Sequence, residues 1–169
     1  IRYEITGGAT GADVTGEPAG VTVNTSSVDQ LNTVTLSDIL AEAGDTHTVR
    51  INGVNYTAVV GDTSKSAIAG VDANVSDRGE VLLVLENEID TALNASGISA
   101  VVTGGTTLTV SSTGFNFDIA VSLNDVDGND GETITVVETI NGGLFLEISG
   151  NPTSTNTTPT TFPIVITTN

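Results

Sequence analysis

The chain has 169 residues, with 21 acidic side chains against only 4 basic ones, and its formal net charge is −17. Phosphate binding needs clustered Lys and Arg, so direct nucleic-acid binding is not expected from four scattered basic residues: Arg2, Arg50, Lys65 and Arg78. The longest apolar run, 81–85, is too short to cross a membrane, and the lack of cysteine excludes disulfides and thiol chemistry.

The N-terminal stretch "IRYEITGG" alternates Ile1, Tyr3 and Ile5 with polar residues, which predicts a strand. The Gly- and Ala-rich segment 7–20 then reads as an arm. Two short strands, "GVTVNT" and "NTVTL", follow. The stretch "SDILAEAG" predicts a short helix that begins at Ser37 and ends at Gly44.

Residues 46–60 predict a β-hairpin, because Asn52-Gly53 suits a type I′ turn with φ > 0 at both central positions. Folding the chain there pairs Ile51 with Val54 and Val49 with Tyr56 on one apolar face. His47, the chain's one histidine, then lies opposite Ala58. It reads as a half-buried residue at a sheet edge, with a general base or a metal ligand as the alternative.

The only long helix is expected over 77–97. Asp77 with Glu80 forms a capping-box pattern at its start, and Gly97 suits its end. Four apolar side chains share one stripe of this helix: Leu82, Leu85, Ile89 and Leu93.

A second hairpin is expected around Gly104-Gly105, followed by a strand over 115–123. The stretch "ETITVVETI" is predicted to turn at Asn141-Gly142 into a final core strand, "LFLEIS". The C-terminal segment is polar and interrupted by proline, but Phe162, Ile164 and Ile166 alternate as in a strand.

These elements predict an α+β fold that is mostly β: an antiparallel β-sandwich or partly open barrel, with one long helix packed on a sheet. We divide the chain into an N-terminal strand and arm (1–30), a single β-rich core domain (31–149), and a polar C-terminal tail with a terminal strand (150–169).

The order hairpin, helix, hairpin over 46–113 resembles the flagellin-hook IN motif, named for an Ile-Asn pair that is Ile51-Asn52 here. Similar units occur in virion structural proteins of tailed phages and in bacterial surface adhesins. The resemblance implies a building block of a virion or an extracellular assembly, and it carries no catalytic residues.

No catalytic constellation is found, since the hydroxyl groups lack a recognisable neighbouring base and no nucleophile motif is present. Glu86 and Asp90, four residues apart on the predicted helix, could in principle act as an acid–base pair. They lie where the apolar stripe gives way to polar residues, so we interpret them as a solvated helix edge.

The acidic turn at 124–132 is the one candidate cofactor site. Asp125, Asp127, Asp130 and Glu132 could turn oxygen atoms toward one Ca²⁺ ion. Counting from Asp125, the turn lacks the Gly and Glu that an EF-hand requires, and the alternative is an ordinary Gly- and Asp-rich turn.

We therefore expect a non-enzymatic, self-assembling structural protein with no cofactor other than this candidate calcium. The first hypothesis is a tailed-phage-like virion component, as a tail tube or a capsid decoration. An extracellular filament or adhesin module is the second, and an enzyme or sugar-binding sandwich is the third. The expected partners are copies of the chain, joined through terminal arms and strand edges, and other virion or filament proteins.

Overall fold

The computed structural model describes residues 2–5, 12–15, 21–37, 42–126, 128, 131–140, 142–150 and 165–168. This part of the chain is mostly β-strand, with one α-helix, as the sequence predicts. The strands are β1 (Arg2–Ile5), β2 (Ala12–Thr15), β3 (Val21–Val28), β4 (Leu31–Leu36), β5 (Thr46–Ile51), β6 (Val54–Val59), β7 (Ile98–Thr103), β8 (Thr107–Ser112), β9 (Ile119–Asn124), β10 (Ile134–Ile140), β11 (Gly143–Gly150) and β12 (Val165–Thr168). The helices are the 3₁₀ turns η1 (Thr63–Lys65) and η2 (Asn94–Ser96), and α1 (Arg78–Leu93).

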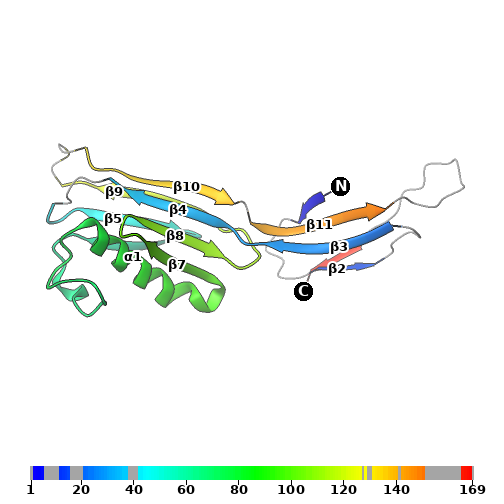
Figure 1. Cartoon of the computed structure of the whole chain (residues 1–169), viewed down its shortest axis with the longest axis horizontal. Helices are drawn as coiled ribbons and strands as arrows, with labels where there is room; N and C mark the ends of the chain where they lie inside the picture. The colour runs from blue at the N-terminus through cyan, green and yellow to red at the C-terminus, as the bar shows by residue number, and fades with distance from the viewer. Residues whose placement is uncertain are drawn as a thin grey trace, which may run out of the picture.

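Two antiparallel sheets and α1 form what we call the body of the molecule (Figure 1). One sheet has the strand order β10-β4-β8-β7 and the other has the order β6-β5-β9. Helix α1 packs against β7 of the first sheet and β6 of the second. On the opposite side β9 lies near β10 without ladder pairing between them, so the sheets do not close into a barrel. The inner faces of both sheets and the apolar side of α1 share one core.

The hairpin of β5 and β6 is confirmed in turn and register. Asn52 has φ 48° and Gly53 has φ 85°, which is the left-handed backbone that a type I′ turn requires. Ile51 pairs with Val54 and Val49 with Tyr56. Val49, Ile51 and Tyr56 are buried, but Val54 is 55% exposed, so in the pair next to the turn only the β5 residue reaches the core.

Helix α1 begins with the predicted capping box. The Asp77 side chain accepts the Glu80 N–H, and the Glu80 carboxylate accepts the Asp77 N–H. Burial alone would raise the pKa of Glu80, but hydrogen bonds outweigh it and lower the pKa. They come from the N–H groups of Asp72, Ser76 and Asp77 and from the Ser76 hydroxyl. This carboxylate therefore fastens the loop before α1 to its first turn. Three residues of the predicted stripe are buried: Leu82, Leu85 and Ile89.

A further set of strands lies beyond one end of the body (Figure 1). In it β11 pairs with both β1 and β3, and β12 pairs with β2, all within one chain. Residues 143–149, which the sequence places in the core domain, thus pair with strands from the N-terminal 30 residues. Ile1, Phe162 and Ile164 lie outside the described residues, as do 38–41 of the predicted short helix.

The hairpin turn predicted at Asn141-Gly142 is wrong. Strand β10 pairs with β4, and β11 pairs with β3, so two strands run in succession along two others. The pairs Ile140–Leu31 and Gly143–Val28 share one register, and the only shift in the ladder lies between Glu138 and Ile140. A single antiparallel ribbon therefore connects the body to the outer strands.

The strand predicted over 115–123 begins later, at Ile119. Before it, the Gln30 side chain takes the place of a neighbouring strand. Its amide oxygen accepts the Phe117 N–H at 2.7 Å, and its amide nitrogen donates to the Phe117 carbonyl at 3.0 Å. Residues 115–118 are therefore held to the end of β3 by a side chain, rather than by a β-ladder.

Candidate assembly surface

The four-stranded sheet has one face in the core and one face toward solvent. The inner face is set by buried side chains such as Val34 on β4, Leu108 and Val110 on β8, and Ile98 on β7. Because side chains alternate along a strand, the residues between them lie on the other face. We call this the outer sheet face. It comprises Leu31, Thr33, Thr35, Ser99, Val101, Thr103, Thr107, Thr109, Ser111, Thr135, Val137 and Ile140.

No position of the outer sheet face carries a charged side chain. The ladders align it in rows across four strands, and one of these rows runs from Val137 through Thr33 and Thr109 to Val101. The outermost apolar members are well exposed: Val137 at 62%, Val101 at 54% and Ile140 at 44%. The chain has 21 acidic residues, and none of them lies on the outer sheet face. The outward face of the three-stranded sheet likewise has no acidic side chain, but it carries the basic Arg50 on β5.

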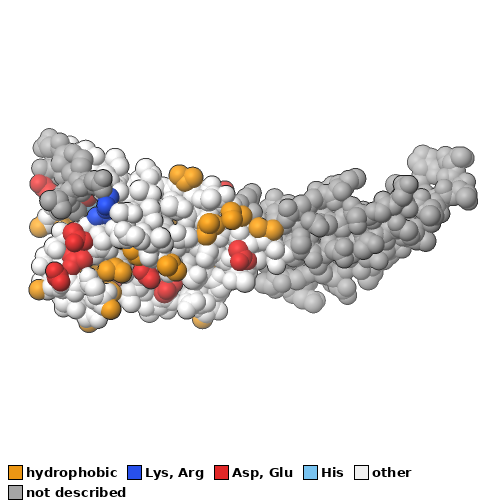
Figure 2. All heavy atoms as spheres, viewed as in Figure 1, with side chains coloured by type: hydrophobic (Ala, Val, Ile, Leu, Met, Phe, Trp, Pro, Cys, Tyr) orange, Lys and Arg blue, Asp and Glu red, His pale blue; other side chains and the backbone are white. Residues whose placement is uncertain are grey.

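The acidic side chains of the body lie elsewhere. In Figure 2 the surface over β4, β8 and β10 is mostly white and orange, whereas red side chains gather mainly over α1 and at the end far from β11. The charge of the chain is therefore unevenly distributed, and the outer sheet face is a place where an approaching acidic surface meets little repulsion.

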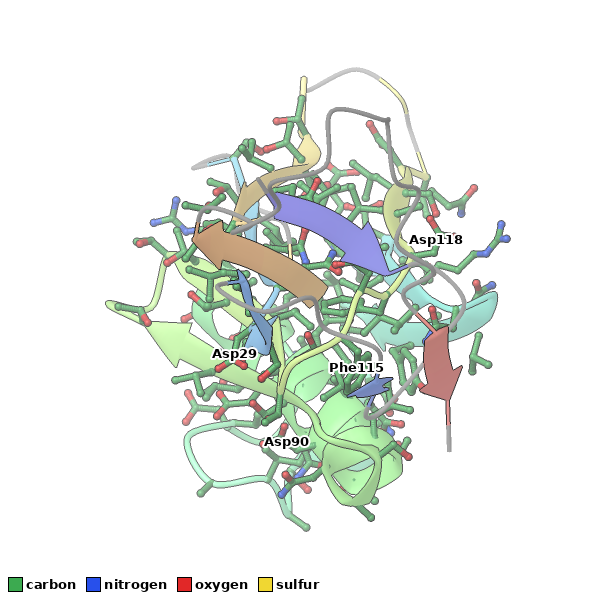
Figure 3. The ribbon with its side chains drawn as sticks, turned by 90° about the vertical axis from the view of Figure 1, so that its right-hand side faces the viewer. Asp29, Asp90, Phe115 and Asp118 are labelled. Atoms are coloured by element: carbon green, nitrogen blue, oxygen red, sulfur yellow. The ribbon has the colours of Figure 1, made fainter. Side chains whose placement is uncertain are left out.

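Glu86 and Asp90 have a role that the sequence did not reveal. Asp90 Oδ1 accepts the Ala100 N–H at 2.8 Å, and Glu86 Oε2 accepts the Val102 N–H at 3.2 Å. These N–H groups belong to the edge strand β7. The interpretation as a solvated helix edge is thus incomplete, because the two carboxylates cover the open edge of β7. In the view along the long axis, Asp90, a residue of α1, lies on one side of the body and Asp118 lies on the other (Figure 3).

The opposite edge of the same sheet is β10. Its outer side has no ladder partner among the described strands, and β9 lies near it without pairing. The exposed Val137 and Ile140 belong to this strand. An unpaired edge with exposed apolar side chains can accept a strand from another chain.

The expectation of a half-buried edge histidine is wrong. His47 is fully buried on β5, and β5 is central because β6 and β9 pair on its two sides. His47 Nε2 lies 3.1 Å from Glu132 Oε1. Nδ1 has no hydrogen-bond partner within the described structure. A neutral imidazole that donates from Nε2 fits this arrangement, because an unpaired Nδ1 is then a lone pair rather than a buried N–H.

Asp45 is the second buried acid beside His47. Its Oδ1 accepts the Val126 N–H at 2.9 Å and its Oδ2 accepts the Glu42 N–H at 2.6 Å. Burial alone would raise the pKa of Asp45, but these two hydrogen bonds lower it, helped by a side-chain hydrogen bond with Glu132 and by His47. For His47, burial lowers the pKa against the opposing charge of Asp45. The acidic turn at 124–132 is thus held to the body by Asp45, His47 and Glu132.

The four predicted calcium ligands are only partly placed. Asp127 and Asp130 lie outside the described residues. Asp125 Oδ1 accepts the Gly128 N–H at 2.8 Å, and Glu132 is buried against His47. Within the described ranges no cluster of three or more His, Cys, Asp or Glu side chains could hold a metal ion. The calcium site therefore stays a prediction.

Two features of the four-stranded sheet were not recognised in the sequence. The outer sheet face was visible only as alternating Thr and Val in "NTVTL" and "TTLTVSS", and the pattern does not say that both strands share a sheet. Asn32 interrupts the inward-facing series of β4, where Val34 and Leu36 are apolar, and it is completely buried. This polar residue in an otherwise apolar series was the signal of an unusual buried position that the sequence offered.

Comparison with known proteins gives a weak likeness only. No protein-family model and no curated protein matches the chain. Among solved structures it is similar to the D1-D2-D3 domains of the flagellar cap protein FliD from Escherichia coli, with 17% identity and a TM-score of 0.31. The match covers 90% of this chain and 56% of that one, so the chain spans about half the length of the cap-protein fragment. No helix in the described part of the chain is long and apolar enough to cross a membrane.

Proposed function

We propose that this protein is a non-enzymatic structural subunit that assembles with copies of itself, and that the outer sheet face is one of the contacts. The observation that carries the proposal is the uncharged character of this face on a chain of net charge −17. The one histidine, the most versatile catalytic side chain, is buried against Glu132 and does not face solvent.

Electrostatics favours this face over contacts that bring the acidic surfaces of two copies together. Subunits of like charge repel one another in most orientations, and the repulsion is screened over about 8 Å at physiological ionic strength. Two outer sheet faces can meet without bringing acidic groups together. Their exposed valines, Val101 and Val137, would then lose contact with water, which is favourable by about 25 cal/mol per Å² of apolar surface.

The face is too small to be the whole of the proposed contact. Four strands about 4.8 Å apart and six residues long cover roughly 400 Å² as a flat area. A standard protein interface buries about 800 Å² on each partner. A stable assembly therefore needs a second contact. The open edge of β10 and the terminal arms are the surfaces that we propose for it.

Within this class we propose a component of a tailed-phage-like virion, as a tail tube or a capsid decoration. The alternative is an extracellular filament or an adhesin module at a cell surface. The hairpin–helix–hairpin order over 46–113 supports both, because the resembling units occur in both kinds of assembly. An acidic wall would favour the tube, since it lets DNA pass without binding it. Other virion or filament proteins are further partners.

The test compares two matched valines at low and at high salt. Val137 and Val54 lie on edge strands of different sheets and are similarly exposed, at 62% and 55%. We expect light scattering of the full chain to show oligomers that grow as salt rises, because screening weakens the repulsion. Val137→Glu should shift the protein toward monomer, and Val54→Glu should assemble as the native chain does.

Electron microscopy of the assembled protein separates the finer alternatives. Rings or tubes support the virion component, and thin fibres support the extracellular filament. A native chain that remains monomeric at every salt concentration would contradict self-assembly. Equal loss of assembly in the Val137→Glu and Val54→Glu variants would show that the outer sheet face is not the contact.

A further inference from the structure

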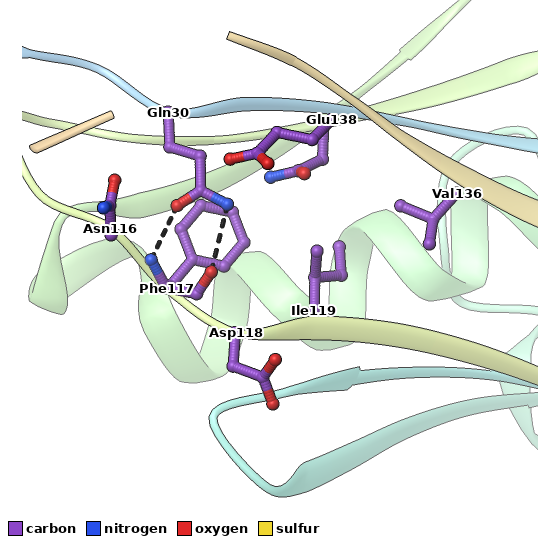
Figure 4. A pocket seen from close by; sticks show the side chains of 8 residues that line it. Gln30, Asn116, Phe117, Asp118, Ile119, Val136 and Glu138 are labelled. Atoms are coloured by element: carbon purple, nitrogen blue, oxygen red, sulfur yellow. Dashed lines mark hydrogen bonds between the residues drawn. The ribbon is translucent and has the colours of Figure 1, made fainter. Parts of the chain in front are cut away.

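A cavity of about 340 Å³ opens between the inner face of the four-stranded sheet and the segment that leads into β9 (Figure 4). Val136 and Ile119 supply apolar walls, one from each sheet. Glu138 contributes an exposed carboxylate and Asn32 lines the cavity from β4, whereas the Asp118 side chain points away from it (Figure 4). Its volume is at the lower end of the range of small-molecule sites.

One wall of the cavity is fixed by the Gln30 side chain. Both polar atoms of its amide are engaged with the backbone of Phe117, as the dashed lines in Figure 4 show. Gln30 therefore has a structural role, and it holds the segment with Asn116 and Asp118 against the sheet.

Asn32 is different, because its buried amide has no partner within the described structure. The residue is completely buried, and neither Oδ1 nor Nδ2 forms a hydrogen bond. An unsatisfied buried amide costs free energy, which a valine at this inward position would avoid, as Val34 does two residues later. Glu138 is its register partner on β10 and lies on the solvent side of the same cavity.

We propose that this cavity binds a small, neutral, polyhydroxylated ligand, a carbohydrate ring, and that the Asn32 amide recognises it. The amide offers one acceptor and two donor protons, so its ligand must be able to donate and to accept. A hydroxyl group does both. A cation would satisfy only Oδ1, and an anion would be repelled by Glu138.

The remaining walls fit the same chemistry. A carboxylate accepts hydrogen bonds from hydroxyl groups, and Glu138 provides one at the mouth of the cavity. The C–H face of a sugar ring is apolar, and Ile119 and Val136 give it apolar surface. The exposed Glu138 side chain can turn outward on its rotatable bonds, which opens the way to Asn32.

The test is a titration of the full, ¹⁵N-labelled chain with three sugars, followed by NMR. We expect saturable shifts of the Asn32 side-chain amide with glucose or N-acetylglucosamine. Glucuronate has the ring of glucose and adds one carboxylate, so it should bind several-fold more weakly. Glu138→Gln should reduce that difference, because it removes the repelling charge at the mouth of the cavity.

Asn32→Val gives the decisive control. It should abolish the shifts elsewhere in the cavity while leaving the melting temperature unchanged or higher, because the unpaired amide is gone. Asn55→Val, on the exposed side of β6, should leave sugar binding intact. Three results would overturn the proposal: no saturable response to any neutral sugar, an equal response after Asn32→Val, or a lower melting temperature of that variant, which would mark Asn32 as the partner of structural water. Shifts of the Asn32 amide with Ca²⁺ or guanidinium in place of sugars would overturn it as well.

Discussion

Gly142 lies so close to Gln30 that it can carry no side chain. A Cβ atom at position 142 would stand 2.4 Å from the Gln30 backbone nitrogen and 2.7 Å from its Cα. Gly142 lies between the end of β10 and the start of β11, and Gln30 lies in the short link between β3 and β4. The glycine is needed for close packing of two backbones.

Gly142→Ala should therefore destabilise the protein by more than about 2 kcal/mol, since a backbone must move to make room. The matched control is Gly53→Ala, where a Cβ atom would meet nothing within 4 Å and only the φ of 85° is unfavourable. That change should cost about 1 kcal/mol. Urea unfolding of both variants measures the difference, and equal losses would show that the close approach is not limiting.

Asp90→Leu should destabilise the chain by about 1–3 kcal/mol, because the N–H of the buried Ala100 loses its acceptor. Asp90→Asn keeps an acceptor oxygen and should be closer to the native protein. Glu88→Ala removes the pair with Lys65, whose side chains are 28% and 38% exposed, and should cost less than about 1 kcal/mol. If Asp90→Leu costs no more than Glu88→Ala in thermal unfolding, the hydrogen bond to β7 contributes little.

The burial of His47 predicts a loss of stability in mild acid. The folded state holds the pKa of His47 below its usual value, so the unfolded chain binds the proton first. The stabilisation is complete above about pH 6.5 and is lost as the pH falls toward the folded pKa. Asp45 adds a second loss as the pH falls below about 4, because its pKa is also lowered. Urea midpoints between pH 8 and pH 3 measure both.

His47→Gln provides the control for this pH dependence. Glutamine can donate to Glu132 but does not titrate, so the decline that begins near pH 6.5 should disappear while the decline below about pH 4 remains. An unchanged profile in the variant would assign the mild-acid loss to another group.

The proposed calcium site predicts that a chelator lowers the melting temperature of the calcium-loaded protein. The double change Asp127→Ala and Asp130→Ala should remove this sensitivity and leave the chelated protein unaltered. Glu132→Gln tests a different role, since Glu132 lies 3.1 Å from His47 and should affect stability with or without calcium. A native chain that melts at one temperature with and without chelator has no such site.

Local chemistry explains which elements could be predicted. The Asn52-Gly53 turn and the capping box of Asp77 and Glu80 depend on residues within a few positions of one another, and both are confirmed. The dipeptide Asn141-Gly142 has the same letters as the first turn, yet here the glycine meets Gln30, far away in the sequence. A turn signal cannot distinguish a positive φ from a close backbone contact.

The same limit applied to the candidate sites. The sequence identified Glu86 and Asp90 as part of a polar helix edge. Their role as hydrogen-bond acceptors depends on β7 lying beside α1. His47 was placed at an edge because the hairpin partner is local, whereas β9, on its other side, begins about seventy residues later. Pairing between distant strands follows from the whole fold, and no short pattern encodes it.

The ribbon that joins the body to the outer strands also determines how the protein would respond to force. The chain passes between the two parts between Val28 and Leu31 and again between Ile140 and Gly143, and the paired strands keep one register across both crossings. A pull along the long axis would act parallel to these strands, so many hydrogen bonds would have to shear together rather than open one after another. A protein of this design would transmit tension through its backbone ladder and stretch little before it failed.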